Sequence, residues 1–174
     1  IEAVNYKLEE EKMGIVLQEV VGNRFKDVYY PHISGVGQSF NYYPVAYMQP
    51  EDGFSVMAVG LGRYVVEGEK AYRYCPKYPR IDINSLKDQY KDSQVHFYAV
   101  DLKKKKIDIL EGEEAGLIKL DIDDAERHGA LKHCASVYDI DNERIITGID
   151  ANGQRNKNFA NIHNINYSPI PETV

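Results

Sequence analysis

The chain has 174 residues, and its 43% apolar and 28% charged content is close to the average for soluble globular proteins. A chain of this length can bury a core as one domain, so the composition excludes disorder and a fibrous repeat. The formal net charge of −6 argues against a nucleic-acid-binding protein, which would need a surplus of Lys and Arg on one face.

The first half of the chain is dominated by predicted strands. Residues 1–13 carry charges around sparse apolar positions, which favours an exposed helix end or a linker. The β-branched run over residues 15–21 predicts a short buried strand. Two further strands are expected over residues 34–43 and 54–59, with turn residues between them. A fourth strand is predicted over residues 70–75, where prolines end it.

The second half predicts one short helix and two hairpins. Ser85–Lys91 is expected to be helical because Asn84 or Ser85 can cap it. Alternating runs over residues 94–101 and 106–110, joined by a lysine cluster, predict the first hairpin. Residues 131–138 and 144–147 predict the second.

The chain is interpreted as one α+β domain in which strands outnumber helices, because it shows neither an internal repeat nor a break in composition. The tail over residues 150–166 has no readable periodicity. No window holds the ~18 consecutive apolar residues of a membrane span, and no signal segment is evident, so a cytoplasmic protein is expected. The sequence begins with Ile1 and ends at Val174 without a cap signal, and we expect a piece of a longer protein.

Several familiar site motifs are incomplete. Gly60-Leu61-Gly62 follows a predicted strand, but Val65 occupies the third glycine position of a dinucleotide-binding fingerprint. The acidic stretches 121–124 and 139–143 lack the glycine of a calcium loop and favour solvated turns. Four potential zinc ligands lack the required spacing; they are Cys75, His128, His133 and Cys134. The two cysteines are expected to be reduced and structural.

Three segments in the first half of the chain form an ordered set. They are Val16-Leu17-Gln18-Glu19-Val20-Val21, then Ser34-Gly35-Val36-Gly37-Gln38-Ser39-Phe40-Asn41-Tyr42-Tyr43-Pro44, then Val59-Gly60-Leu61-Gly62-Arg63-Tyr64-Val65-Val66-Glu67-Gly68. Together they resemble the ATP-binding region of phosphoenolpyruvate synthases, pyruvate phosphate dikinases and their antibiotic-phosphorylating relatives. The resemblance covers about residues 14–80. Residues 81–174 match no pattern of the family and fit an insertion peculiar to a subfamily.

The resemblance implies an ATP-grasp-like nucleotide-binding subdomain, with an additional hairpin-containing second half. Its first segment would be the adenine hinge. The C=O of Glu19 and the N–H of Val21 would bind the adenine edge, because these groups of residues i and i+2 lie on one edge of an extended strand. Gln18 would add a polar contact, and Val20 belongs to the same hinge. We expect this strand to present a free edge; a plain core strand is the alternative.

The third segment would form a tight turn beside the hinge. The resemblance places Gly60, Gly62 and Arg63 at the nucleotide, and we expect Gly60-Leu61-Gly62 within about 15 Å of Val21, on the scale of one small domain. Arg63 departs from the family pattern, which has glutamate at this position. Any contact made by that carboxylate is therefore lost or reversed in charge here.

Relatives move a phosphoryl group from ATP to a histidine on a swivelling domain, which then delivers it to pyruvate. The resemblance therefore implies ATP and Mg²⁺ as cofactors of the parent protein, and its remaining domains as partners: an N-terminal lobe with lysine and arginine, and the phosphohistidine domain. Neither the lobe nor the magnesium carboxylates are recognised here, so no catalytic residue and no metal ligand is assigned. We expect the fragment alone to be inactive and to bind no cofactor tightly.

A second hypothesis is a non-catalytic interaction or regulatory module that has kept the fold. Arg63 in place of glutamate and the unmatched second half favour it. Whether the parent protein is an active enzyme therefore stays open at this stage. The sequence also does not indicate whether pyruvate, an antibiotic or a glucan accepts the phosphate.

Overall fold

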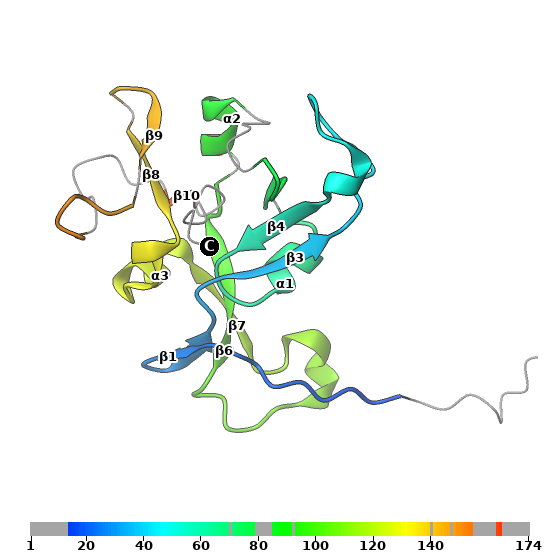
Figure 1. The fold of residues 1–174 in the computed structure, drawn as a ribbon. Helices are drawn as coiled ribbons and strands as arrows, with labels where there is room; N and C mark the ends of the chain where they lie inside the picture. The colour runs from blue at the N-terminus through cyan, green and yellow to red at the C-terminus, as the bar shows by residue number, and fades with distance from the viewer. Residues whose placement is uncertain are drawn as a thin grey trace, which may run out of the picture.

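The structure is a computed structural model that describes residues 14–69, 71–78, 85–91, 93–139, 141–146, 148–154 and 163–164 (Figure 1). The strands are β1 (Asn23–Phe25), β2 (Val28–Tyr30), β3 (Ser34–Gln38), β4 (Phe54–Ala58), β5 (Tyr72–Tyr74), β6 (His96–Asp101), β7 (Leu117–Asp121), β8 (Ser136–Asp139), β9 (Arg144–Ile146) and β10 (His163–Asn164). The α-helices are α1 (Arg63–Val66), α2 (Leu86–Lys91) and α3 (Ile122–Arg127). The 3-10 helices are η2 (Pro50–Asp52), η3 (Ile109–Glu114) and η4 (Ala130–His133).

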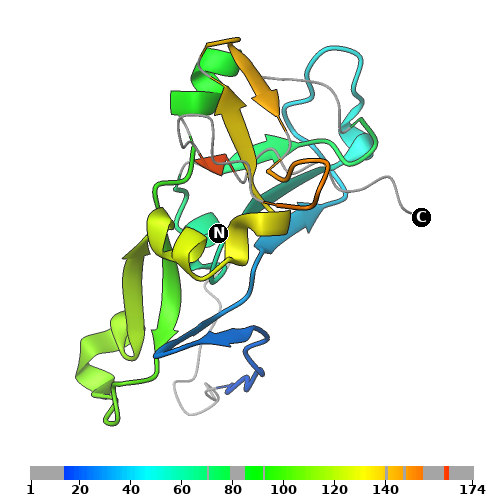
Figure 2. The same ribbon diagram turned by 90° about the vertical axis from the view of Figure 1, so that its left-hand side faces the viewer.

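Three small antiparallel sheets carry the described part of the chain. Their strand orders are β1-β2-β6-β7, β3-β4-β5 and β10-β8-β9. Figure 1 shows the β3–β4 pair on one side of β6 and the β8–β9 hairpin on the other, and Figure 2 shows the same arrangement from the side. Short helices connect the strands, so the mixed, strand-rich α+β class is confirmed.

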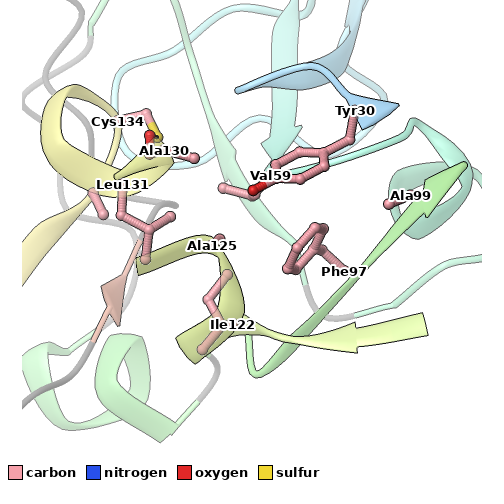
Figure 3. Packing of buried hydrophobic residues seen from close by; sticks show 10 residues of the cluster. Tyr30, Val59, Phe97, Ala99, Ile122, Ala125, Ala130, Leu131 and Cys134 are labelled. Atoms are coloured by element: carbon pink, nitrogen blue, oxygen red, sulfur yellow. Dashed lines mark hydrogen bonds between the residues drawn. The ribbon is translucent and has the colours of Figure 1, made fainter. Parts of the chain in front are cut away.

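Strand β6 separates two groups of buried side chains. Successive residues of a strand point to opposite faces, so Phe97 and Ala99 enter one core while Tyr98 enters the other. The larger core joins β2, β6, α3 and η4 and is drawn in Figure 3. Its buried members are Tyr30, Val59, Phe97, Ala99, Ile122, Ala125, Ala130, Leu131, Cys134 and Ala135. The smaller core packs α1 against the other face of β6 and consists of Ala58, Tyr64 and Tyr98.

Helix α3 was not expected, because its first residues were interpreted as a solvated turn. That prediction is wrong. The Asp121 side chain accepts a hydrogen bond from the Asp123 N–H at 2.9 Å and caps the helix. Asp123 and Asp124 then lie in the first turn, where the helix dipole favours negative charge. The acidic stretch is therefore a helix start, which lets Ile122 and Ala125 reach the larger core.

Several predicted elements are confirmed. Strands β4, β5 and β6 fall inside the predicted ranges 54–59, 70–75 and 94–101. Helix α2 falls inside Ser85–Lys91, and the Asp88 N–H donates to the Ser85 hydroxyl at 3.2 Å, as a capping serine requires.

The predicted strand over residues 106–110 is wrong. Strand β6 pairs instead with β7, after a longer connection that contains η3. The Asp108 side chain accepts from the Leu110 N–H at 2.9 Å and so caps a 3-10 turn at this point. Ile107 and Leu110 are exposed, so no core holds this stretch in a sheet.

Two other predicted ranges are partly wrong. The strand expected over residues 34–43 ends at Gln38, and the strand expected over residues 131–138 begins only at Ser136, after η4. The second hairpin itself is confirmed, since β8 pairs with β9 in antiparallel register. Its turn is not fully solvated, because the Asp139 carboxylate is buried and accepts from Asn142 Nδ2 at 2.7 Å. The predictions for residues 1–13 and most of the tail lie outside the described residues.

Candidate functional site

The glycine segment over residues 60–62 forms the predicted tight turn, between β4 and α1. Gly60 has a φ of +81°, a left-handed conformation that glycine adopts without steric cost. The Leu61 N–H donates to the carbonyl oxygen of Tyr98 at 2.9 Å, which fixes the turn on β6. Helix α1 begins directly afterwards, with Gly62 at its N-cap position.

Gly60 lies so close to β6 that no side chain fits there. A Cβ at this position would lie 2.7 Å from the carbonyl oxygen of Tyr98 and 2.8 Å from Cδ2 of Phe97. On its other side, the Ser34 hydroxyl of β3 donates to the carbonyl oxygen of Gly60 at 2.6 Å. The turn therefore joins β3, β4 and β6, which belong to two different sheets.

A buried glutamine completes this junction. The Gln94 side chain accepts from the Val59 N–H at 2.9 Å and donates to the Val59 carbonyl oxygen at 3.1 Å. Its amide also donates to the carbonyl oxygen of His96 at 2.9 Å. The Gln94 side chain thus makes the two hydrogen bonds to Val59 that a neighbouring strand would otherwise make. It thereby fixes the position of the glycine turn relative to β6.

Arg63 lies at the start of α1, and its charge is already engaged. Its Nε donates to Glu67 Oε1 at 2.6 Å, and its Nη2 lies 3.5 Å from Glu114 Oε1. The guanidinium carbon stands 4.9 Å from the centre of the Tyr98 ring. The hydrogen bond to Glu67 raises the pKa of Arg63 above its already high ordinary value. Arg63 is therefore a cation held by its own helix and by η3.

A second polar contact ties the end of this helical turn to β6. His96 Nε2 lies 3.2 Å from Glu69 Oε1, and the His96 ring packs edge-on against Tyr64 with 5.3 Å between ring centres. Burial, followed by the charge of Glu69 and the neighbouring Tyr98, raises the pKa of Tyr64 to about 12. Tyr64 is thus neutral near pH 7 and acts as a packing residue.

The hinge residues Gln18, Glu19, Val20 and Val21 are not in a strand. Residues 14–22 belong to no sheet, and all but Gly22 are exposed, so the predicted buried strand over 15–21 is wrong. The physical reason is the absence of a sheet partner: the following residues turn back as the β1–β2 hairpin, and β2 takes β6 as its other neighbour. Strand propensity alone does not make a strand.

The structure therefore brings together two of the three segments. The glycine turn makes its contacts with β3 and β6. The hinge residues lie in the segment that precedes β1 (Figures 1 and 2). Sequence reasoning missed Gln94 and Tyr98, which hold the turn. A buried Gln and a Tyr in an alternating strand give no signal of that role.

Other candidate chemistry is limited. Among the residues that the structure describes, no group of three or more His, Cys, Asp or Glu side chains could hold a metal ion. Cys75 and Cys134 are buried thiols, as expected of structural cysteines. None of the described helices is long and apolar enough to cross a membrane.

Comparison with known proteins adds no relative. No protein-family model, no curated protein and no solved structure matches the chain.

Proposed function

We propose that this chain is the nucleotide-binding portion of a cytoplasmic, ATP-dependent phosphotransferase of the phosphoenolpyruvate synthase and pyruvate phosphate dikinase type. ATP and Mg²⁺ would be cofactors of the parent protein, whose remaining domains would be the partners of this portion. Pyruvate would receive the phosphoryl group through a phosphohistidine on one of those domains.

One observation carries the proposal. The serine-glycine segment and the glycine turn, which are 26 positions apart in the sequence, meet through the hydrogen bond from the Ser34 hydroxyl to the Gly60 carbonyl oxygen. Strand β3 also pairs with β4, the strand that leads into the glycine turn. Segments that jointly contact one ligand have to be neighbours, and these two are.

The surface around this contact suits the close approach of a ligand. Gly37 of β3 is exposed, and a Cβ at Gly62 would have only the Ser34 side chain nearby, at 3.9 Å. Gly35 is also exposed, but packing against β4 already requires glycine there, because its Cβ would lie 2.5 Å from the Val56 carbonyl oxygen. Glycine leaves the backbone accessible to a bound group. The β3 strand and the glycine turn thus offer an open backbone surface on one side of the sheet.

The same geometry explains why the chain alone would hold ATP weakly. Phosphoryl transfer needs cations on the phosphates, and the Arg63 guanidinium is already paired with Glu67 and stacked over Tyr98. A hinge that makes two hydrogen bonds contributes about 1 kcal/mol from each, before the cost of immobilising the ligand. The expected affinity of this chain for ATP is therefore millimolar or weaker.

The engaged Arg63 also favours a second candidate, a non-catalytic interaction or regulatory module. A non-catalytic module can keep its fold when the nucleotide-contacting glutamate of the family is replaced by an arginine that only stabilises the packing. In that case Arg63 would stabilise the contact between α1 and η3 and would have no partner in a ligand.

Titration calorimetry with ATP and Mg²⁺ separates the candidates. The 174-residue protein and the parent protein are titrated in parallel. We expect micromolar binding by the parent, as is common for such enzymes, and millimolar or weaker binding by the shorter protein. Failure of the parent to bind would favour the regulatory module. Micromolar binding by the shorter protein would show that its own residues hold the triphosphate.

A further inference from the structure

The segment over residues 14–21 combines strand-forming residues with unusual exposure. Leu17 is 92% exposed and Val16 is 81% exposed, although both are apolar and β-branched or bulky. The other exposed apolar members are Ile15, Val20 and Val21. Side chains on both sides of the segment face solvent, so its present position buries neither face.

Strand β3 offers an outer edge of matching character. It is the first strand in the order β3-β4-β5, so only its β4 side is paired within the described sheet. Two apolar side chains are exposed at this strand: Val36 within it is 39% exposed, and Ile33, which precedes it, is 40% exposed. An exposed edge that contains glycines and apolar side chains is a template for one more strand.

The β1–β2 hairpin sets the register in which the segment would extend along this edge. Its register pairs Phe25 with Val28 and Asn23 with Tyr30. The next pair in line is Gly22 with Pro31. A Cβ at Gly22 would lie 2.7 Å from the carbonyl carbon of Tyr30 and 2.9 Å from the nitrogen of Pro31, so the two chains are already in contact there.

Proline at this point does not block continuation. Phe25 and Val28 flank a two-residue turn and form a hydrogen-bonded pair. Hydrogen-bonded and non-hydrogen-bonded pairs alternate along an antiparallel ladder, so Gly22 and Pro31 form a non-hydrogen-bonded pair. The missing N–H of Pro31 is not needed at such a position.

Continuing the same register matches apolar residues with apolar residues. Val20 falls opposite Ile33, on one face of the ladder. Leu17 falls opposite Val36, on the other face. All four side chains are exposed in the present arrangement, and facing pairs of this kind stabilise a sheet. A shift by one residue leaves one apolar match in place of two, Val21 with Ile33 in one direction or Val16 with Val36 in the other.

We propose that residues 14–21 dock on the outer edge of β3 as an additional antiparallel strand, in the register set by the β1–β2 hairpin. Docking places Glu19 opposite Ser34, whose hydroxyl is bound to Gly60. In the alternation of this ladder Glu19–Ser34 and Val21–His32 are hydrogen-bonded pairs, so docking engages the Glu19 carbonyl oxygen and the Val21 N–H that an adenine hinge needs. The docked strand would therefore block nucleotide binding at the hinge. The link of this strand to nucleotide binding rests on the proposed function; the docking itself does not.

A pair of engineered cysteines tests the register. Val16 and Gly37 fall opposite each other at a non-hydrogen-bonded position, where Cβ atoms come within disulfide range. Gly37 tolerates a side chain, because its Cβ would lie 3.5 Å from the Ser55 hydroxyl. The matched control replaces Leu17 and Gly37, which would point to opposite faces. The native cysteines are buried and do not compete.

Under mild oxidation we expect V16C/G37C to form an intrachain disulfide roughly tenfold or more faster than L17C/G37C. Equal rates for the two pairs would overturn the proposal, since a loose segment would react without register. A disulfide between chains would overturn it as well, because the strand would then add to a second copy.

Nucleotide binding is read separately in the same proteins. If the V16C/G37C disulfide forms and the oxidised protein binds ATP more weakly than its reduced form, docking and the proposed function both stand. If the disulfide forms and ATP binding is absent in both the locked protein and the parent protein, docking stands and the proposed function fails. If the parent protein binds ATP but the disulfide does not form, docking fails and the proposed function stands.

Discussion

Replacement of Gly60 by alanine is the sharpest perturbation of the glycine turn. Two costs add at this position. A non-glycine residue in the left-handed conformation, here at φ +81°, costs about 1–2 kcal/mol. The new Cβ would also overlap Tyr98 and Phe97, at 2.7 and 2.8 Å, and overpacking of this kind costs about 1–3 kcal/mol. The expected loss in the free energy of unfolding is therefore about 2–5 kcal/mol, a large share of a typical total of about 5–15 kcal/mol.

Gly68→Ala is the matched control. Gly68 has a similar φ of +75°, but a Cβ there would meet nothing within 4 Å. It should lose only the conformational part, about 1–2 kcal/mol. Urea unfolding at equilibrium gives both values from the shift of the midpoint at constant m. If Gly60→Ala loses no more than Gly68→Ala, the close approach of the turn to β6 is not real, and the site built on it is wrong.

The remaining predictions concern the groups that hold the core and the turn. Gln94→Ala should cost about 2–4 kcal/mol in urea unfolding, because it leaves the buried N–H and C=O of Val59 without partners, whereas the exposed Gln38→Ala should change stability by less than about 0.5 kcal/mol. Tyr30→Phe should cost about 1–2 kcal/mol, because it removes the 2.8 Å hydrogen bond between the Tyr30 hydroxyl and His128 Nδ1; an unchanged midpoint would mean that this bond adds nothing. Burial lowers the pKa of His128, so the unfolded chain takes up the proton first as the pH falls, and stability should decline between about pH 7 and pH 5. His128→Gln should flatten that decline, and an equally steep decline in the variant would assign it to other groups.

The strands predicted correctly are those whose bounds and buried faces follow from their own residues and the residues next to them. The alternation of β6 is visible in the sequence, because Phe97 and Ala99 face one core and Tyr98 faces the other. Strand β4 is bounded by Gly53 and Gly60, both at positive φ, so its ends are marked by glycine. Local chemistry and tertiary packing agree at these places.

The missed elements depend on contacts that no local pattern reveals. The β1–β2 hairpin turns at Lys26, which has a φ of +54° although it is neither Gly nor Asn, so the usual turn signal is absent. The run over residues 106–110 looks like a strand, but β7 pairs with β6 in its place. Residues 15–21 show the same limit, because a strand needs a partner as well as propensity.

The candidate site was predictable only in part. The sequence indicates the turn at Gly60, because glycines on both sides of Leu61 are typical of a tight turn. It does not indicate that Arg63 is neutralised by Glu67 and Glu114, because Glu114 is far along the chain and belongs to η3. Side-chain pairing across elements is a property of the fold.

The most direct test of the central claim is an amide chemical-shift titration of the 174-residue protein with ATP and Mg²⁺, with GTP as the control nucleotide. Millimolar binding in fast exchange is visible by this method, so weak affinity is no obstacle. The proposed function predicts shifts that saturate with ATP, that are smaller with GTP, and that concentrate at Glu19–Val21 and Gly60–Arg63. No shift at those residues, or equal shifts with both nucleotides spread over the surface, would contradict it.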